Sequence, residues 1–358
     1  MNKKRKRVVV AMSGGVDSSV AAALLVEQGY EVIGMMMRLW SEPGADHFNR
    51  CCTPESMALA KRVASKLNVP FYAIDAKEPF CDIVVRSFID GYKNGITPNP
   101  CLVCNNSIRW GIFLKRALMI EADYMATGHY ARLEKSDKDQ IQLLRAVDQK
   151  KDQSYVLHML NQYQLKHTLL PLGIYTKEEV RQIARNYDLP VAERPESQDL
   201  CFLGDEDYRD FLARKSPEVI SPGYIYSTEG KQIGQHRGLA FYTIGQRKGL
   251  EINASIPMYV VKKDIQHNTL IVGSREKLGR SEFFADSVNW LSGQPPGNTF
   301  LAQVKIRYKA QAVSCKVINL TEKRVLVNLF QHLPDITPGQ AAVFYNNEVC
   351  LGGGIIQL

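Results

Sequence analysis

Val8-Val-Val-Ala-Met12 followed by Ser13-Gly-Gly-Val-Asp-Ser-Ser19 is the stretch that decides the fold of this chain. The apolar run predicts a strand buried on both faces, and the two glycines predict a tight turn into a helix over residues 16–28. A buried strand that turns directly into a helix is typical of a parallel sheet covered by helices. At such a turn, backbone N–H groups and the helix dipole bind phosphate oxygens. The stretch therefore predicts a nucleotide-phosphate loop.

The residues of this loop exclude some classes of nucleotide-binding protein. The loop lacks the Gly-Lys-Ser/Thr ending of a Walker A motif, which argues against a P-loop kinase or GTPase. Asp17 does not favour a bare phosphate, because both groups are negative. It therefore indicates either a bound Mg²⁺ or a positioning role.

The first half of the chain continues the alternation of strands and helices. Thr53 and Pro54 have the character of a cap and a first helical residue, and that helix is expected to end near Asn68. Further strands are predicted over residues 31–37, 71–74 and 124–127, with a helix over 81–88. The fold class is therefore α/β, with a doubly wound, mainly parallel sheet.

The second half changes texture twice. Beyond residue 150 the pattern is helical, and Thr176-Lys-Glu-Glu179 matches a capping box. From about residue 223, short strands are predicted over residues 224–226, 241–244, 258–261 and 269–272. Five more, over residues 300–308, 312–319, 324–330, 341–345 and 348–357, suggest a small barrel, with a turn-rich boundary near 292–297. We expect an α/β catalytic domain over 1–205, a β-rich adaptor over 206–280 and a β-barrel over 281–358.

Composition excludes several classes of protein. The 358 residues are 45% hydrophobic and 23% charged, and no apolar run approaches the ~20 residues that cross a bilayer. The apolar run after the basic start is shorter than that of a signal peptide, so we expect a cytoplasmic protein, and a monomer by default. The net charge, 45 − 37 = +8, suits a polyanionic partner.

The cysteines add a second kind of chemistry. Two thiols lie in Thr97-Pro-Asn-Pro-Cys101-Leu-Val-Cys104-Asn105, before a helix predicted to begin near Ser107, and a helix dipole favours a nearby thiolate. Cys201 lies in a loop-like stretch ahead of acidic residues. Cys-x-x-Cys indicates metal binding or redox chemistry, but Cys51-Cys52 is poorly spaced as a second zinc ligand pair. Inert buried thiols are the interpretation for Cys81, Cys315 and Cys350.

Together these residues resemble a known family. The phosphate loop is similar to the SGGxDS loop of ATP-pyrophosphatases, which cleave ATP between its α and β phosphates and adenylate an oxygen. From end to end the chain resembles the bacterial tRNA-uridine 2-sulfurtransferases, the tRNA-specific 2-thiouridylases. The matching strings are residues 11–19, the segment ending at Cys104-Asn105, Ala126-Thr-Gly-His-Tyr130, Lys151-Asp-Gln-Ser154, the segment around Cys201, Gly245-Gln-Arg-Lys-Gly249, Arg307-Tyr308 and Thr337-Pro-Gly-Gln340.

The resemblance implies a reaction and its participants. The reaction is ATP-dependent 2-thiolation of the wobble uridine of tRNA: adenylation of the C2 oxygen, then sulfur transfer from a cysteine persulfide, giving 2-thiouridine, AMP and pyrophosphate. ATP and Mg²⁺ are the implied cofactors. The implied partners are tRNA, bound in part by the C-terminal barrel, and a sulfur-donor protein, either a persulfide relay or a cysteine desulfurase.

The resemblance also implies roles for single residues. Cys104 is the expected nucleophile and Cys201 the expected persulfide carrier, the two closing a disulfide during turnover, while Asp17 acts through Mg²⁺. The expected ATP contacts are Ala11, Met12, Ser13, Gly14, Gly15, Val16, Asp17, Ser18, Met37 and Gly128. The expected contacts with tRNA or its target base are Asn99, Pro100, Cys101, Lys151, Asp152, Gln153, Arg307, Tyr308 and Gln340. His129 follows Gly128 at the C-terminal end of a predicted strand, where such sheets bind ligands, so we expect it to position the RNA or base rather than to ligate a metal or to be an ordinary polar residue at a strand end.

Three further expectations concern details. Relatives often have aspartate at the position of Cys101, which is either a bystander or a competing thiol; we prefer a bystander, because only Cys104 precedes the matching asparagine. The Cys201 segment is predicted to be mobile, since a disulfide needs Cα atoms within roughly 4.4 to 6.8 Å. The basic residues of 231–248 indicate a phosphate-contacting face rather than an ordinary solvated one: Lys231, Arg237, Arg247 and Lys248.

Other functions remain alternatives. An amide-forming ligase, such as an NAD or GMP synthetase, shares the loop but needs neither Cys104 nor Cys201. An ATP-binding RNA-binding protein without catalysis would tolerate serine at both positions. A 4-thiouridine-forming sulfurtransferase normally carries extra RNA-binding and sulfur-carrier modules, which are not recognisable here. For sulfur transfer, direct attack by the persulfide and attack by released sulfide fit the residues equally well.

Overall fold

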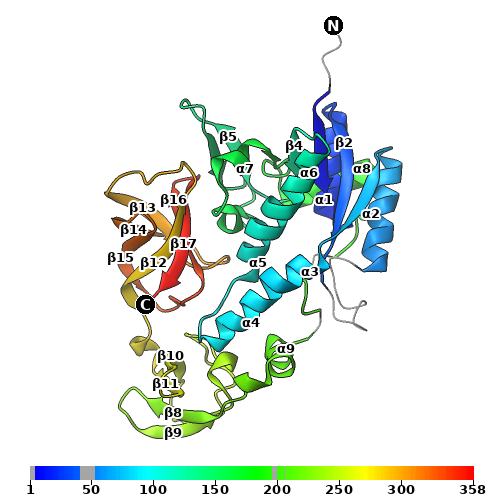
Figure 1. The fold of residues 1–358 in the computed structure, drawn as a ribbon. Coiled ribbons are helices and arrows are strands. Elements are labelled where there is room, and N and C mark those ends of the chain that lie inside the picture. Colours follow the sequence, from blue (N-terminus) through cyan, green and yellow to red (C-terminus); the bar gives the residue numbers. More distant parts are fainter. Residues whose placement is uncertain (1–4, 41–52, 196–199, 205) are drawn as a thin grey trace.

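The computed structural model describes residues 5–40, 53–195, 200–204 and 206–358. Figure 1 shows an N-terminal sheet with its helices, a small sheet coloured green to yellow, and a barrel coloured orange to red. Cys51, Cys52 and the residues 196–199 ahead of Cys201 lie outside the described residues.

The N-terminal sheet confirms the predicted doubly wound fold. Its strand order is β3-β2-β1-β4-β7, and every pairing is parallel. Strand order reverses at β1, which pairs with β2 on one side and β4 on the other; such a reversal is where α/β sheets bind ligands. The strands are β1 (Arg7–Ala11), β2 (Glu31–Arg38), β3 (Phe71–Asp75), β4 (Tyr124–Ala126) and β7 (Thr168–Leu169).

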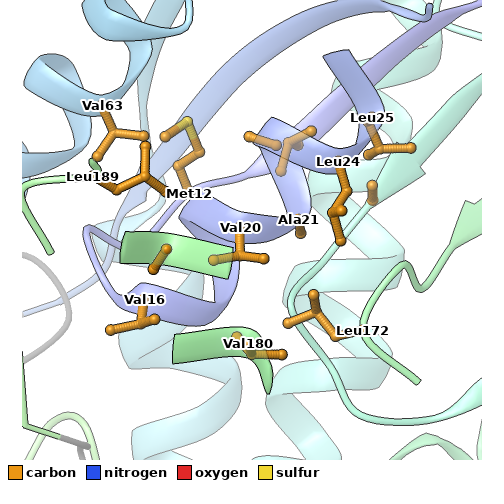
Figure 2. Close-up of a cluster of buried hydrophobic side chains, with 14 of the residues drawn as sticks. Met12, Val16, Val20, Ala21, Leu24, Leu25, Val63, Leu172, Val180 and Leu189 are labelled. Atoms are coloured by element: carbon orange, nitrogen blue, oxygen red, sulfur yellow. The ribbon is translucent and has the colours of Figure 1, made fainter. Parts of the chain in front are cut away.

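Helix α1 (Val16–Glu27) follows β1 directly and forms the centre of one core. It is apolar nearly all round, and Val20, Ala21 and Leu25 are fully or almost fully buried. Figure 2 shows them in one cluster with Val63 of α2 (Pro54–Lys66) and with Val180 of α8 (Lys177–Asn186), which lies near Val20. Thr53 caps α2 as predicted, and α8 begins with the predicted capping box. This packing fixes the start of α1 relative to β1.

The helical segments between β3 and β4 differ from the prediction. The helix expected near Ser107 begins at Pro100 instead, as α5 (Pro100–Val103), η2 (Cys104–Phe113, a π-helix) and α6 (Leu114–Met119) in direct succession. Asn99 is the N-cap, and its side chain accepts a hydrogen bond from the Cys101 backbone N–H. Upstream lie α3 (Lys77–Phe80), η1 (Cys81–Val85, also a π-helix) and α4 (Arg86–Lys93).

The central domain is a four-stranded sheet in the order β10-β11-β8-β9. Its strands are β8 (Gly223–Ser227), β9 (Gln232–His236), β10 (Tyr259–Asp264) and β11 (Thr269–Gly273). The strand predicted over residues 241–244 is wrong: Phe241 ends the 3₁₀ turn η5 (Leu239–Phe241), and Phe241 and Tyr242 are buried in the core beneath the sheet. Strand β9 was not predicted.

The C-terminal barrel has six strands rather than the predicted five. They are β12 (Arg280–Trp290), β13 (Thr299–Lys305), β14 (Val313–Thr321), β15 (Arg324–Leu333), β16 (Ala341–Asn346) and β17 (Val349–Gln357), and pairing of β12 with β17 closes the barrel. The expected boundary near 292–297 is therefore wrong, since this turn joins β12 to β13 inside the barrel.

The barrel sheet continues into the N-terminal half of the chain. Strand β17 also pairs with β6 (Ile141–Leu144), which pairs with β5 (Arg132–Lys135). One core accordingly contains Trp110 and Phe113 of η2 together with Val343 and Tyr345 of β16. The barrel is thus packed against the helix that begins at Pro100.

The remaining short elements connect these parts. They are η3 (Ser154–Leu157), α7 (Gln162–Lys166), α9 (Tyr208–Lys215), η4 (Pro217–Val219) and η6 (Arg275–Lys277). Across the described ranges, every helix is too short or too polar to span a bilayer.

Candidate active site

The phosphate loop occupies the predicted place, between the end of β1 and the start of α1. Gly15 is the N-cap of α1, so the first amides of the helix point out of the turn. Hydroxyl groups brace the loop from within: the Ser18 hydroxyl accepts from the Ser13 backbone N–H at 3.1 Å and donates to the Gly15 carbonyl at 3.2 Å. Ser19 donates to the same carbonyl at 2.8 Å. These hydrogen bonds within the loop fix its shape.

Two glycines allow neighbouring backbone to touch the loop. Gly14 has a φ of +72°, and a side chain there would strike the backbone of Ser56 at the start of α2. Gly128 follows β4, and a Cβ on it would lie 2.7 Å from the Asp17 carbonyl carbon and 2.8 Å from the Ser18 nitrogen. The segments after β1 and β4 thus meet where the strand order reverses, so the structure brings the predicted Gly128 to the loop.

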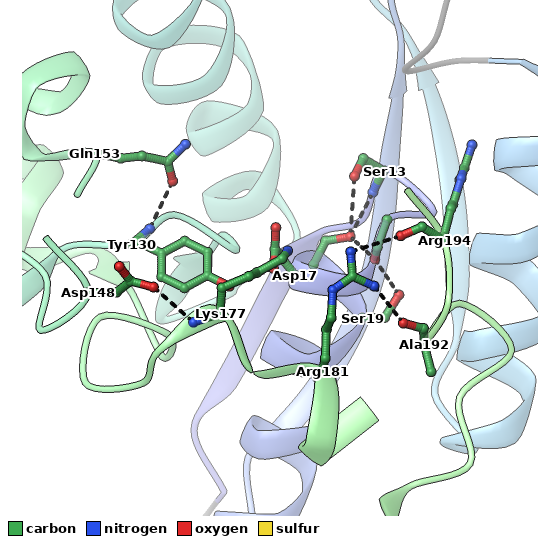
Figure 3. Close-up of polar contacts among 12 residues, drawn as sticks. Ser13, Asp17, Ser19, Tyr130, Asp148, Gln153, Lys177, Arg181, Ala192 and Arg194 are labelled. Atoms are coloured by element: carbon green, nitrogen blue, oxygen red, sulfur yellow. Dashed lines mark hydrogen bonds and ion pairs between the residues drawn. The ribbon is translucent and has the colours of Figure 1, made fainter. Parts of the chain in front are cut away.

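Three side chains that the sequence analysis missed surround the loop (Figure 3). The Asp17 Oδ1 atom accepts from the Tyr130 hydroxyl at 2.7 Å and from the Lys177 ammonium at 2.6 Å. Arg194 donates to the Gly14 carbonyl at 2.6 Å and to the Ser56 hydroxyl at 2.8 Å. Tyr130 ends the motif Ala126-Thr-Gly-His-Tyr130, and Lys177 follows the predicted helix cap Thr176. No local pattern indicates that either side chain faces Asp17.

The other expected ATP contacts border the same sheet edge. Ala11 ends β1, and the buried Met12 donates its backbone N–H to Met35 of β2. Met37 lies near the end of β2, partly buried, and packs against two cores. Val16 is the first residue of α1 and is buried, so only its backbone amide is available to a ligand. Parallel strands present their carboxyl ends together, which explains this gathering.

The cysteine segment starts a helix instead of preceding one. Pro100 and Cys101 lie in the first turn, where the helix dipole acts most strongly, and Cys104 lies in the second turn, where its effect declines. Cys101 is exposed and Cys104 is buried. Cys104 is also the first residue of the π-helix η2, a rare form that is frequent at functional sites.

Cys201 packs against the same core as Cys104. This core also contains Phe202, whose ring lies 5.2 Å from Phe88 of α4 and 5.7 Å from Phe211 of α9 between ring centroids. Cys201 itself is half-buried in a turn, as the predicted loop requires. Met37 packs against this core as well. One cluster therefore joins both candidate sulfur residues to a candidate nucleotide contact.

Of the three cysteines predicted to be buried and inert, two are buried, whereas Cys81 is only half-buried. Cys315 and Cys350 are buried in barrel strands, and burial raises both thiol pKa values, that of Cys315 to about 12. Burial also raises the pKa of Cys81, which is half-buried. A thiol with a raised pKa is a poor nucleophile near neutral pH.

His129 lies between the phosphate loop and the cysteine helix. It follows Gly128, its Nδ1 is 2.7 Å from the Thr127 hydroxyl oxygen, and its ring centroid is 5.5 Å from that of Trp110 of η2. Burial and the nearby Arg109 cation lower the pKa of His129 to about 3. The imidazole is therefore neutral at physiological pH.

The loop of residues 151–153 is anchored to the strand end that carries Tyr130. The Tyr130 N–H donates to the Gln153 side chain at 2.9 Å, and the Gln153 N–H donates to the Tyr130 carbonyl at 2.7 Å. Asp152 is buried, and its carboxylate accepts from the Ala146 and Ser154 backbone N–H groups. Lys151 is half-buried beside them. Asp152 thus faces the protein interior.

Thr97, two residues before the helix cap, is where all three parts of the chain meet. Its N–H donates to the Pro338 carbonyl at 2.9 Å, and its carbonyl accepts from the Gln340 side chain at 2.8 Å. Its hydroxyl lies 3.4 Å from that of Thr243 in the central domain. The predicted residue Gln340 therefore fixes the backbone that leads to Cys101 and Cys104.

The two remaining predicted contacts lie near this junction. Arg307 donates to the Thr337 hydroxyl at 2.7 Å, in the same loop as Gln340. The Tyr308 ring lies 6.2 Å from that of Tyr155 in η3. The four basic residues predicted to contact phosphates are exposed: Lys231, Arg237, Arg247 and Lys248. The neighbouring His236, Phe241 and Tyr242 are buried.

Comparison with known proteins places the chain in a family. Residues 6–205 match the family model described as the tRNA methyl transferase HUP domain, residues 209–274 the corresponding PRC-barrel domain, and residues 280–356 the aminomethyltransferase beta-barrel domain. The tRNA-specific 2-thiouridylase MnmA of Natranaerobius thermophilus is 46% identical over 98% of this chain and 97% of its own length. That of Chloroflexus aggregans is 46% identical over 98% of each chain. The loop, the two cysteines and this similarity over nearly the whole length agree, and the chain belongs to the tRNA-specific 2-thiouridylase family.

Proposed function

We propose that this protein thiolates the wobble uridine of tRNA at C2, with ATP activating the C2 oxygen. The observation that carries the proposal is the core that Cys104, Cys201 and Met37 share. Met37 lies near the carboxyl end of β2, which pairs with β1, the strand that leads into the phosphate loop. A nucleotide at the loop and a sulfur carrier at Cys201 would then serve one target base. The names of the relatives, tRNA-specific 2-thiouridylases, support the same reaction.

The first step requires stabilisation of negative charge. A uridine C2 oxygen is a poor leaving group, and its attack on the α-phosphate of ATP forms an adenylate and releases pyrophosphate. The amides of residues 13–18 stabilise the departing charge as fixed dipoles. The Asp17 carboxylate suits Mg²⁺, which proteins commonly hold through one or two carboxylates and the substrate phosphates. Bound there, Mg²⁺ would supply charge neutralisation.

The second step uses both cysteines. In the direct route, the terminal sulfur of the Cys201 persulfide bonds to C2, AMP leaves, and the Cys104 thiolate attacks the Cys201 sulfur, breaking its bond to the transferred atom. In the sulfide route, Cys104 attacks first, and the released sulfide displaces AMP. Both routes form a Cys104–Cys201 disulfide. An external thiol reductant must donate two electrons to return it to two thiols. A turn at Cys201 suits the approach that this disulfide requires.

We further propose how the substrate and partners are held. The target base is contacted by Asn99, Pro100, Cys101 and His129. The rest of the tRNA is contacted by Lys151, Gln153, Arg307, Tyr308 and Gln340, several of which are held in place by hydrogen bonds within the protein. The buried Asp152 shapes its loop from inside. A sulfur-donor protein loads Cys201, and the enzyme acts as a monomer of three domains, residues 1–205, 206–280 and 281–358.

Mass analysis of nucleosides tests the function. Unmodified tRNA with a wobble uridine is incubated with the protein, Mg²⁺, ATP and a sulfur donor, beside a Cys201→Ser sample. We expect an oxygen-to-sulfur mass gain that is absent from the variant. If ATP is instead cleaved to AMP and pyrophosphate with a small-molecule acceptor and no thiolated base, the protein is an amide-forming ligase.

A further inference from the structure

A half-buried lysine at the phosphate loop has no part in the reaction described so far. Lys177 is the first residue of α8, and its ammonium donates to Asp17 Oδ1 at 2.6 Å. Its side chain is 12% exposed, against 35% for Asp17, so the cation is largely removed from water. Figure 3 shows it reaching the start of α1 from a segment far away in the sequence.

The position is unfavourable for a lysine unless an anion is near. The start of a helix carries a partial positive charge, which repels a cation in the first turn. The Lys177 backbone is nevertheless fixed there, because its N–H donates to the Asp148 carboxylate at 3.0 Å. The Tyr130 ring lies 5.9 Å below the ammonium and its hydroxyl binds the same Asp17 oxygen, so the ammonium is oriented from two sides.

The charge balance of the loop leaves room for a second cation. The loop itself contains one carboxylate, that of Asp17. The guanidinium of Arg194 is directed at the Gly14 carbonyl and at Ser56. A polyphosphate beside Asp17 adds several negative charges, and one Mg²⁺ offsets two of them. We propose that Lys177 is a phosphate-binding residue whose ammonium contacts the β- and γ-phosphates of ATP and then the released pyrophosphate, with Asp17 and Tyr130 orienting it.

This inference rests on the proposed ATP-dependent function and makes a selective prediction. Lys177→Met is expected to weaken ATP and pyrophosphate binding by about ten- to one-hundred-fold, the loss of one charge-assisted hydrogen bond. AMP lacks the β- and γ-phosphates, so its affinity should change by less than about twofold. Isothermal titration of the full chain with ATP, pyrophosphate and AMP measures all three, without any thiolation.

Two further variants separate phosphate binding from mere neutralisation of Asp17. Arg185→Met removes a positive charge from the same helix, where Arg185 pairs with the exposed Glu193, and should leave all three affinities unchanged. If Lys177 only neutralised Asp17, the Lys177→Met loss would vanish in an Asp17→Asn background. We expect it to persist there. Thermal unfolding checks each variant, and Lys177→Gln replaces Lys177→Met if the methionine variant does not fold.

The outcomes are distinct. Equal weakening of AMP and ATP, unchanged ATP affinity, or disappearance of the effect in Asp17→Asn would each overturn the role of Lys177. Failure of the unaltered protein to bind ATP would instead overturn the proposed function. Retention of ATP affinity in Lys177→Arg, beside its loss in Lys177→Met, supports a charge contact with phosphate.

Discussion

The phosphate loop and the cysteine helix are held in different ways. Tyr130, Lys177 and Arg194 hydrogen-bond to the loop, and all three lie within the first 205 residues. The cysteine helix is preceded by Thr97, which bonds to the barrel through Gln340 and to the central domain through Thr243. The residues that hold the nucleotide loop therefore all come from one domain, whereas the position of the cysteine helix depends on all three domains.

The largest effect should separate the two thiols of the cysteine segment. Cys104→Ser is expected to reduce thiolation more than about a thousandfold, because serine cannot resolve a persulfide, while ATP affinity stays unchanged. Cys101→Ser is the matched control, three residues away, and should retain thiolation within about twofold. Nucleoside mass analysis measures both. Loss of thiolation in Cys101→Ser would make Cys101 a participant rather than a bystander.

Gly128→Ala should damage the other region. The added methyl group would lie 2.7 Å from Asp17 backbone, and neither contacting segment is a flexible side-chain end. Overpacking of this kind costs about 1–3 kcal/mol, so we expect ATP to bind about ten- to one-hundred-fold more weakly. Gly297→Ala, where a Cβ has room, is the control glycine. Unchanged ATP affinity in Gly128→Ala would show that the loop tolerates displacement.

Asn99 offers a finer test, because it caps the cysteine helix and is also a proposed base contact. Asn99→Ala should destabilise the fold by about 1 kcal/mol and slow thiolation about three- to tenfold. Asn99→Ser restores a capping oxygen without the amide. Chemical denaturation and initial thiolation rates distinguish the roles: recovery of both indicates capping alone, and recovery of stability alone indicates that the amide contacts the base.

The smallest effect concerns two buried imidazoles. Burial lowers the pKa of His129 to about 3 and that of His158 to about 4, from an ordinary 6.5. The unfolded chain then takes up protons that the folded chain refuses, so stability is present above pH 6.5 and falls as the pH drops toward these values. The slope is at most about 1.4 kcal/mol per pH unit for each imidazole. Urea midpoints between pH 7 and pH 5 measure it.

A paired substitution checks the source of this acid sensitivity. His129→Gln should flatten the fall in stability, because an amide takes up no proton in this range. His332→Gln, on the surface of the barrel, is the matched control for the substitution itself. An identical slope in His129→Gln would mean that His129 is protonated in the folded protein.

Local patterns predicted the parts of the site that depend on neighbours in sequence. The loop, the Thr53 cap and the capping box at Thr176 all follow from residues within one turn of each other. Asn99-Pro100 carried the same kind of signal, a cap followed by proline at the first helical position. The prediction instead placed this segment ahead of a helix beginning near Ser107. The helix start was therefore readable, and the prediction near Ser107 was an error of interpretation.

Contacts that close over long distances could not be predicted in this way. No local pattern pairs Lys177 with Asp17, because the ion pair exists only once α8 has packed on α1. Strand β12 was missed because its first residues are charged and a register shift interrupts its pairing with β15. The π-helical form of η2 has no sequence signature; its Trp110 and Phe113 side chains lie in one core with residues of the barrel.

The pairing of β17 with β6 joins two strands that lie far apart in the sequence, and this affects how the chain folds. Leu144 pairs with Val349, so an early hairpin must wait for one of the latest strands before its outer edge is covered. Until then the nascent nucleotide domain presents an open strand edge, the kind of surface that recruits chaperones or aggregates. Pairing with the barrel thus covers a strand edge of a hairpin that lies about 200 residues earlier in the chain.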